Sequence, residues 1–119
     1  MKRDMDLMRD ILLWLEDNHS GVPVFQDRDK LEIGYHCHLL ADAGLIEAAN
    51  SSHMEDPVPQ AHPLSITSKG HDFIDASRSK TIWSSVKNKV ISSTGGVSIA
   101  ILTELLKDEA KRRLGLSAT

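Results

Sequence analysis

The feature that most constrains the fold is "YHCHLLADAGLIEA", residues 35–48, where a helical pattern stops at a glycine and an apolar segment begins at once. Gly44 is typical of the residue that follows a helix, because glycine adopts a left-handed backbone freely. The segment "LIEA" over 45–48 then predicts a short strand. Upstream, apolar residues at helical spacing predict a helix over about 29–43; they are Leu31, Ile33, Cys37, Leu40 and Ala43.

The rest of the chain supplies more helices and a second strand. The segment "VPVF" over 22–25 predicts an extended or edge segment because it contains a proline. The segment "LSIT" over 64–67 predicts the second strand, and the proline-rich residues 50–63 predict an irregular loop between the strands. Apolar spacing predicts four further helices: over about 4–18, from Thr67 or Ser68 to about Ser79, around Trp83 up to Gly95 and Gly96, and from about Ser98 onward.

This order of elements indicates a fold class. Helix, short segment, helix, strand, long loop, strand and helix is the order of a winged helix, in which two strands and their loop form the wing. The expected fold is mainly α with a small two-stranded antiparallel wing, a winged helix-turn-helix with added C-terminal helices. We expect a winged-helix domain over 1–79 and a C-terminal helical extension over 80–119, which packs on that domain or dimerises.

Composition and charge narrow the class of protein. Hydrophobic residues make up 40% and charged residues 26%, which is near the globular average and speaks against a disordered tail or a membrane span. The N-terminal stretch has no uninterrupted apolar run typical of a signal peptide, so we expect a cytoplasmic protein of a bacterial host. The net charge of −3 is uneven, with −7 over residues 1–60 and +4 over residues 61–119. A nucleic-acid site in the first half would therefore start at an electrostatic disadvantage.

The adjacent residues His36, Cys37 and His38 raise the question of a metal site or a nucleophile. Successive helical residues point about 100° apart, so the two histidines project in different directions and do not chelate one metal together. Cys37 falls on the apolar face of the predicted helix, which indicates a buried structural thiol. We expect no metal and no other cofactor.

A glycine in "TSKGHDFID" indicates close packing. Thr67 or Ser68 is placed to cap the helix that follows the second strand, and Gly70 falls in the first turn, where a side chain would press on neighbouring backbone. Trp83 in "TIW" is expected to pack the added helix onto the domain rather than to bind a cofactor.

Three stretches resemble a known family: "MKRDMDLMRDIL" at the start, "YHCHLLADAGLIEA", and "LSITSKGHDFIDASRSKTIW". They are similar to an uncharacterised bacterial and phage family that is catalogued as a domain of unknown function. The resemblance implies a winged helix with extra C-terminal helices and a phage or prophage origin. Cys37 departs from the family pattern, where an aliphatic residue is usual, and the wing loop is long and rich in proline and histidine.

No phosphate-binding glycine loop, catalytic triad, paired carboxylates or Cys-x-x-Cys pair is present, so the sequence indicates a non-enzymatic protein without a small-molecule substrate. The favoured hypothesis is a phage-type or prophage-type binding module that acts through protein interaction, in regulation or host interference. Its partner would be another protein or a second copy of the chain, with no membrane involved. The candidate interaction surface comprises Tyr35, His36, His38, Asp42 and His53.

The alternative hypothesis is a winged-helix DNA-binding transcriptional regulator. Its readers would be outward residues of the second helix and of the wing: Gly34, Tyr35, His38, Ala41, Ser51, Ser52 and His53, with Lys30 as basic support. Double-stranded DNA is expected to bind weakly, because no Arg or Lys occurs from Leu31 to Gln60 and few phosphates would be neutralised.

The last helix carries a second candidate surface. Its apolar stripe is long for a chain of this size, and a symmetric dimer needs only one self-complementary patch. The competing interpretation is that the stripe packs within its own chain. The candidate dimer residues are Ile99, Leu102, Leu106 and Leu114, with Ala110 on the same stripe and Ile101 and Leu105 widening it.

Overall fold

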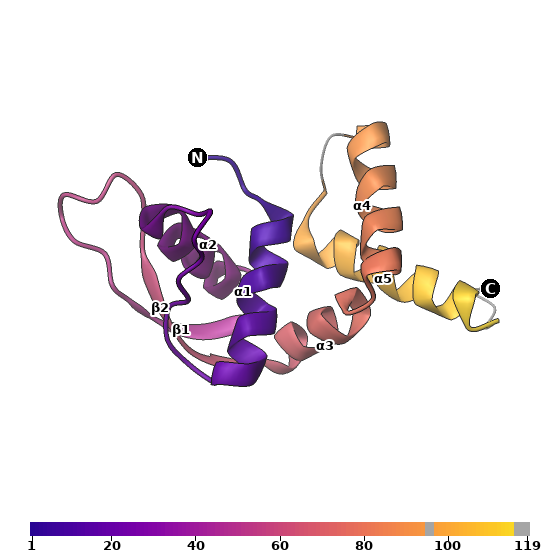
Figure 1. Ribbon diagram of the computed structural model, residues 1–119, viewed down its shortest axis with the longest axis horizontal. Helices are drawn as coiled ribbons and strands as arrows, with labels where there is room; N and C mark the ends of the chain where they lie inside the picture. The colour runs from indigo at the N-terminus through magenta and orange to yellow at the C-terminus, as the bar shows by residue number, and fades with distance from the viewer. Residues whose placement is uncertain (95–96, 116–119) are drawn as a thin grey trace. The chain divides into compact units, whose positions relative to one another are not determined.

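The computed structural model describes residues 1–94 and 97–115, and within these ranges it is mainly helical with one two-stranded antiparallel sheet (Figure 1). None of the helices in these ranges is long and apolar enough to cross a membrane. The chain divides into two compact units, Met1–His71 and Asp72–Thr119. The elements in chain order are α1 (Met5–Asn18), α2 (Lys30–Asp42), β1 (Ile46–Asn50), β2 (Ala61–Ile66), α3 (Ser68–Ser77), α4 (Lys80–Thr94) and α5 (Ile99–Arg113).

The core of the first unit forms where α1, α2 and the sheet pack together. The α1 helix begins after Asp4, whose carboxylate accepts a hydrogen bond from the Leu7 backbone N–H at 3.1 Å. Apolar residues at helical spacing then bury one face of α1 and of α2, as predicted. The buried residues are Leu7, Met8, Ile11, Leu12 and Leu15 on α1, and Ile33, Cys37 and Leu40 on α2.

The two strands pair as the sequence predicted. In the antiparallel register Ile46 lies opposite Ile66 and Glu47 opposite Ser65, before an irregularity shifts the pairing to Ala48 and Pro63. The strand β2 begins at Ala61, so the expected loop over 50–63 is too long at its C-terminal end. The Pro63 carbonyl faces the α1–α2 connection, where it accepts the Gly21 N–H at 3.0 Å. The N and C=O of one strand residue face the same side, so Pro63 is tolerated in β2 because its missing N–H is not needed by β1.

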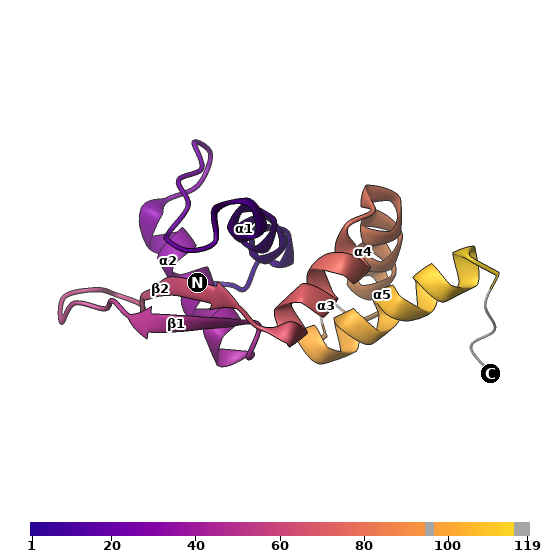
Figure 2. The same ribbon diagram turned by 90° about the horizontal axis from the view of Figure 1, so that it is seen from below.

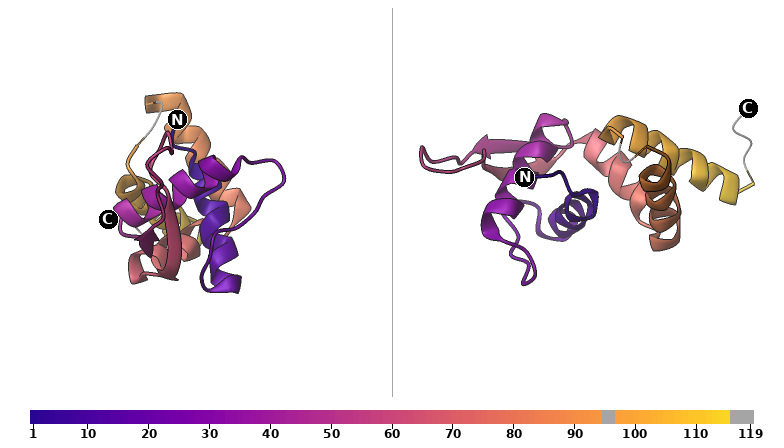
Figure 3. Two further views of the ribbon diagram at one scale, coloured as in Figure 1. Left: turned by 90° about the vertical axis from the view of Figure 1, so that its left-hand side faces the viewer. Right: turned by 90° about the horizontal axis from the view of Figure 1, so that it is seen from above.

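The loop between β1 and β2 extends away from α1 and α2, and three views agree on this (Figures 1, 2 and 3). The segment "VPVF" over 22–25 connects α1 and α2 without pairing in the sheet.

The junction between α2, β1 and α3 depends on two glycines. Gly44 has φ +80° and ends α2, as its sequence position predicted. The Thr67 hydroxyl donates to the Gly44 carbonyl at 2.6 Å and accepts the Gly70 N–H at 3.1 Å, which makes Thr67 the cap of α3. A Cβ atom on Gly70 would lie 2.0 Å from the Leu45 carbonyl oxygen. The predicted close approach at Gly70 is therefore confirmed.

The second unit contains the rest of α3 together with α4 and α5. Phe73 of α3 and Trp83 of α4 are both buried, and their rings meet edge to face with centroids 5.9 Å apart. This contact agrees with the packing role expected for Trp83. The α5 helix packs against α4 and starts after Ser98, whose hydroxyl accepts the Ile101 N–H at 3.2 Å. The expectation that Gly95 and Gly96 end the preceding helix falls outside the described residues.

Candidate interaction surface

One face of α2 carries three of the five residues predicted for the interaction surface. Tyr35, His38 and Asp42 are separated by three and four residues, so they project from the same side of the helix. The Tyr35 and His38 rings are stacked, with centroids 6.2 Å apart and planes 21° from parallel. Tyr35 and His38 are half-buried, and Asp42 is exposed. This stacked pair followed by a carboxylate forms what we call the α2 face.

His36 is a correction to the predicted surface, because it is buried beside the α2 face, where its ring meets the Tyr35 ring edge to face with centroids 5.7 Å apart. The side chain is fully buried, and its Nε2 atom accepts the Asp4 backbone N–H at 2.9 Å. Its Nδ1 atom lies 2.8 Å from the Glu32 carbonyl oxygen and must donate to it, which fixes the neutral ring with its proton on Nδ1. His36 therefore joins α2 to the start of α1 through these two hydrogen bonds.

Asp4 also forms an ion pair with Arg28. Arg28 Nη1 donates to Asp4 Oδ2 at 2.6 Å and lies 3.6 Å from Glu32 Oε1. Burial acts to raise the pKa of the Asp4 carboxyl, but the hydrogen bonds from Arg28 and from the Leu7 N–H outweigh it and leave that pKa below its ordinary value of 3.8. The same ion pair raises the pKa of Arg28. The pair secures the N-terminal end of α1.

Cys37 is buried, as predicted, with no exposed surface. Burial raises the pKa of its thiol to about 12. Since the thiolate is the reactive form, this environment suits a packing residue and not a nucleophile. Within residues 1–94 and 97–115, no group of three His, Cys, Asp or Glu side chains is placed to hold a metal ion.

His53, the fifth predicted residue, lies in the loop between β1 and β2 and is exposed. Its backbone N–H donates to Asp56 Oδ2 at 2.7 Å, and its carbonyl accepts the Asp56 N–H at 3.0 Å. This turn presents Met54, which is fully exposed and which sequence analysis missed. An apolar side chain between polar loop residues was the available signal.

The base of the loop is fixed on α2 by Gln60. The Gln60 Nε2 atom donates to the Leu31 carbonyl at 3.0 Å, and its backbone N–H donates to the Ser52 hydroxyl at 2.8 Å. The side chain covers Gly34, where an added Cβ would lie 1.8 Å from Gln60 Oε1. Gly34 is therefore buried and does not point outward, which corrects its assignment as a DNA-reading residue.

The predicted dimer stripe on α5 is mostly buried within the single chain. Ile99, Leu102 and Leu106 are at most 4% exposed, so they are not available to a partner copy. Their assignment as dimer contacts is wrong, because the stripe serves as core. Leu114 is 76% exposed, and Ile101 and Leu105 are also exposed. Self-association through these three residues stays a prediction.

Two comparisons with known proteins cover the α2 face and the loop. A model of the family described as "Hypothetical protein (DUF2513)" matches residues 2–97. An uncharacterized protein of Haemophilus influenzae is 34% identical over 110 residues, which span 88% of this chain and 92% of that protein. No solved structure matches the chain.

Proposed function

The chain belongs to the family described as "Hypothetical protein (DUF2513)", and from this premise we propose that it is a non-enzymatic winged-helix module that binds another protein through the α2 face. In this proposal α2 acts as the helix in front of the wing, and β1, β2 and their loop form the wing. The order of α1, α2 and the paired strands supports the winged-helix assignment. The phage or prophage origin implied by the family resemblance stays a prediction.

The observation that carries the proposal is the stacked pair of Tyr35 and His38. Tyrosine is enriched in protein interfaces because its ring offers a rigid contact area and its hydroxyl a hydrogen bond. The stacking holds both rings in one orientation before a partner arrives, which lowers the entropy lost on binding. Asp42 places a carboxylate at the edge of the pair, where it can select a partner with a complementary charge.

The alternative function, sequence-specific DNA binding through the same helix and wing, follows from the same order of elements. The charge of the first unit argues against it. Residues 1–71 carry a net charge of −6, and no Arg or Lys occurs from Leu31 to Gln60. A helix placed in the major groove would lack phosphate anchors beside it.

A site-specific photo-crosslinking experiment tests the protein-binding proposal. A photoreactive phenylalanine analogue replaces Tyr35 in one variant and, as a control, Thr81 on an exposed turn of α4 in another. After irradiation in host cells, the proposal expects a discrete crosslinked species from position 35 that position 81 does not give. Purified partner is then titrated against the unmodified chain and a variant with Tyr35→Ala and His38→Ala. We expect affinity to fall by about 10-fold or more, the loss of one or two central interface residues.

Two results would contradict the proposal. One is the absence of any crosslink specific to position 35. The other is unchanged partner affinity of the double variant while its circular dichroism matches that of the unmodified chain. A shift of a specific DNA duplex at nanomolar concentration and physiological salt, lost in the double variant, would establish the alternative instead.

A further inference from the structure

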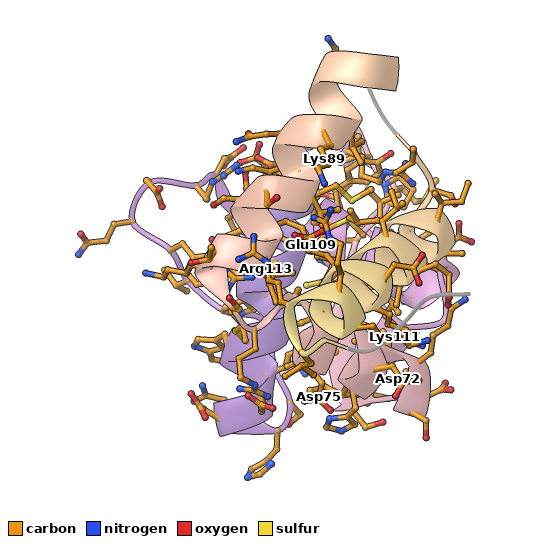
Figure 4. The ribbon with its side chains drawn as sticks, turned by 90° about the vertical axis from the view of Figure 1, so that its right-hand side faces the viewer. Asp72, Asp75, Lys89, Glu109, Lys111 and Arg113 are labelled. Atoms are coloured by element: carbon orange, nitrogen blue, oxygen red, sulfur yellow. The ribbon has the colours of Figure 1, made fainter. Side chains whose placement is uncertain are left out.

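Glu109 is a buried carboxylate in the second unit that is surrounded by cations. Its side chain is 6% exposed although it lies on α5, a helix with a charged outer face. Arg112 and Arg113 from the next turn both donate to it, Arg113 Nε at 3.0 Å from Oε1. Lys89 reaches it from α4, with Nζ 3.7 Å from Oε2 (Figure 4). One carboxylate therefore organises three cations from two helices, which we call the Glu109 cluster.

The Glu109 cluster keeps an excess of positive charge at the surface. Its three cations and one carboxylate leave a formal charge of +2, and the side chains of Lys89, Arg112 and Arg113 are 63%, 66% and 43% exposed. A guanidinium has five N–H donors, and the contact with Glu109 engages one nitrogen of each arginine. The remaining donors of two pre-positioned guanidiniums suit an anion with several acceptor oxygens.

A neighbouring surface shows that this excess is local. Asp72, Asp75, Lys107 and Lys111 line a groove of about 340 Å³ between α3 and α5, together with Ala76 and Ala110. Two carboxylates there balance two lysines, and Lys107 also pairs with Glu104 at 3.8 Å. The groove therefore offers no net attraction for an anion, whereas the Glu109 cluster does.

We propose that the Glu109 cluster binds phosphate groups of a nucleic-acid backbone without reading base sequence. Phosphate oxygens match the guanidinium donors, and cations presented from two helices can meet successive phosphates of one strand. Residues 72–119 carry a net charge of +3 against −6 for residues 1–71, so a polyanion is attracted to this unit alone. The site is distinct from the α2 face and does not depend on it.

The number of cations in the Glu109 cluster sets how steeply the affinity for DNA falls with salt concentration. Three phosphate contacts predict a slope of log K against log salt of about −2.7 on duplex DNA, or about 40-fold weaker binding between 50 and 200 mM salt. The experiment titrates a fluorescent 20-base-pair duplex of arbitrary sequence with the full chain across that range and records anisotropy. Lys89→Ala should raise the slope by about 0.9, and so should Arg112→Gln.

The controls separate this site from the rest of the chain. Lys107→Ala removes a cation from the charge-balanced groove outside the Glu109 cluster, so the slope should stay unchanged. Lys89→Ala leaves both arginines on Glu109, so this variant should give the circular dichroism spectrum of the unmodified chain. It therefore tests the proposal even if Arg112→Gln does not fold. Tyr35→Ala with His38→Ala should not alter the slope either. The DNA-binding proposal for the Glu109 cluster and the protein-binding proposal for the α2 face can therefore fail independently of each other.

Three results would overturn the proposal. They are the absence of duplex binding at the lowest salt, a slope that Lys89→Ala leaves unchanged, and displacement of the duplex by polyglutamate at equal charge concentration. The last result would assign the cluster to an acidic protein. The proposal is supported if duplexes of different sequence give equal slopes and only the cluster variants make the slope less negative.

Discussion

The backbone N–H of Asp4 donates to Nε2 of His36 at 2.9 Å, across 32 positions of sequence. Asp4 is also the cap of α1 and the ion-pair partner of Arg28. One residue thus caps the start of α1, neutralises a cation and anchors a second helix. The contact therefore joins α2, which carries Tyr35 and His38, to the N-terminal end of α1.

Replacing His36 with Ala tests that dependence. The change leaves the Asp4 N–H and the Glu32 carbonyl without their partner in a buried site and opens a cavity, so we expect the free energy of unfolding to fall by about 2–4 kcal/mol. Urea titration followed by circular dichroism measures it. His38→Ala is the matched control, because His38 is half-buried on the α2 face, and should cost less than about 1 kcal/mol. Equal losses in the two variants would contradict the assigned role of His36.

Asp4 predicts how stability responds to acid. Its folded-state pKa lies below the ordinary value of 3.8, so its contribution is fully present above about pH 4 and is lost as the pH falls through the folded-state pKa. Asp4→Asn removes this titration and the ion pair with Arg28, while its amide oxygen can still accept the Leu7 N–H. We expect the loss of this partly exposed ion pair to cost about 0.5–1 kcal/mol at pH 7 and to flatten the decline of stability below pH 4. Thermal melting between pH 2 and pH 7 compares the two proteins, and parallel curves would refute the prediction.

The stability of a Gly70→Ala variant depends on two opposing effects, a steric clash and a gain in helix propensity. Alanine in a helix is favoured over glycine by about 1 kcal/mol, but here its Cβ would lie 2.0 Å from a backbone oxygen of Leu45. Backbone cannot rotate aside as a side-chain end can, so we expect a net destabilisation of about 1–3 kcal/mol. Lys69→Ala, on an exposed position of the same turn, is the control and should be neutral in chemical denaturation. A stabilised Gly70 variant would show that the close approach is absent.

The Cys37 thiol should react slowly in the native protein. Its pKa is raised to about 12 and it is fully buried, so little thiolate forms at pH 8 and a reagent must wait for unfolding. Labelling with a chromogenic disulfide should be slow in buffer. It should be rapid in about 6 M guanidinium chloride, which unfolds nearly every ordinary domain. Rapid labelling of the folded chain would contradict the packing.

Glutamate substitutions on the buried side and on the exposed side of α5 should affect the stability of the second unit differently. Leu102→Glu with Leu106→Glu buries two carboxylates, since both leucines are at most 3% exposed, and should unfold the second unit at a cost of about 4 kcal/mol or more. Ile101→Glu with Leu105→Glu alters exposed positions and should leave the helical circular dichroism unchanged. Sedimentation velocity of the second variant also tests self-association through the exposed side. An unfolded second variant would be the opposite of the expected result.

Local patterns explain why most elements were predictable. Helical spacing of apolar residues, the Gly44 stop and the Thr67 cap each act within a few residues, so the sequence was enough to predict α1, α2, α3 and α5 closely. The bounds of β2 were less predictable, because a proline fits a strand only where its missing N–H faces away from the partner strand. At Pro63 that side faces Gly21, 42 residues earlier in the chain.

The candidate surface was predictable only in part for the same physical reason. Tyr35, His38 and Asp42 share a helix face by spacing alone. The burial of His36 needed the position of Asp4, and the burial of Gly34 needed Gln60. The Glu109 cluster combined a local signal, cations three and four residues after a carboxylate, with Lys89 from another helix.

Pro63 has a consequence for association between copies of the chain. An unpaired strand edge is a template on which a second chain can add a strand and start an aggregate. At the outer edge of β2, Pro63 has no N–H to offer, and its carbonyl is occupied by Gly21. A strand that approached this edge would meet a missing donor and an engaged acceptor at the same position. The outer edge of β2 is thus protected at this position against the addition of a strand from another chain.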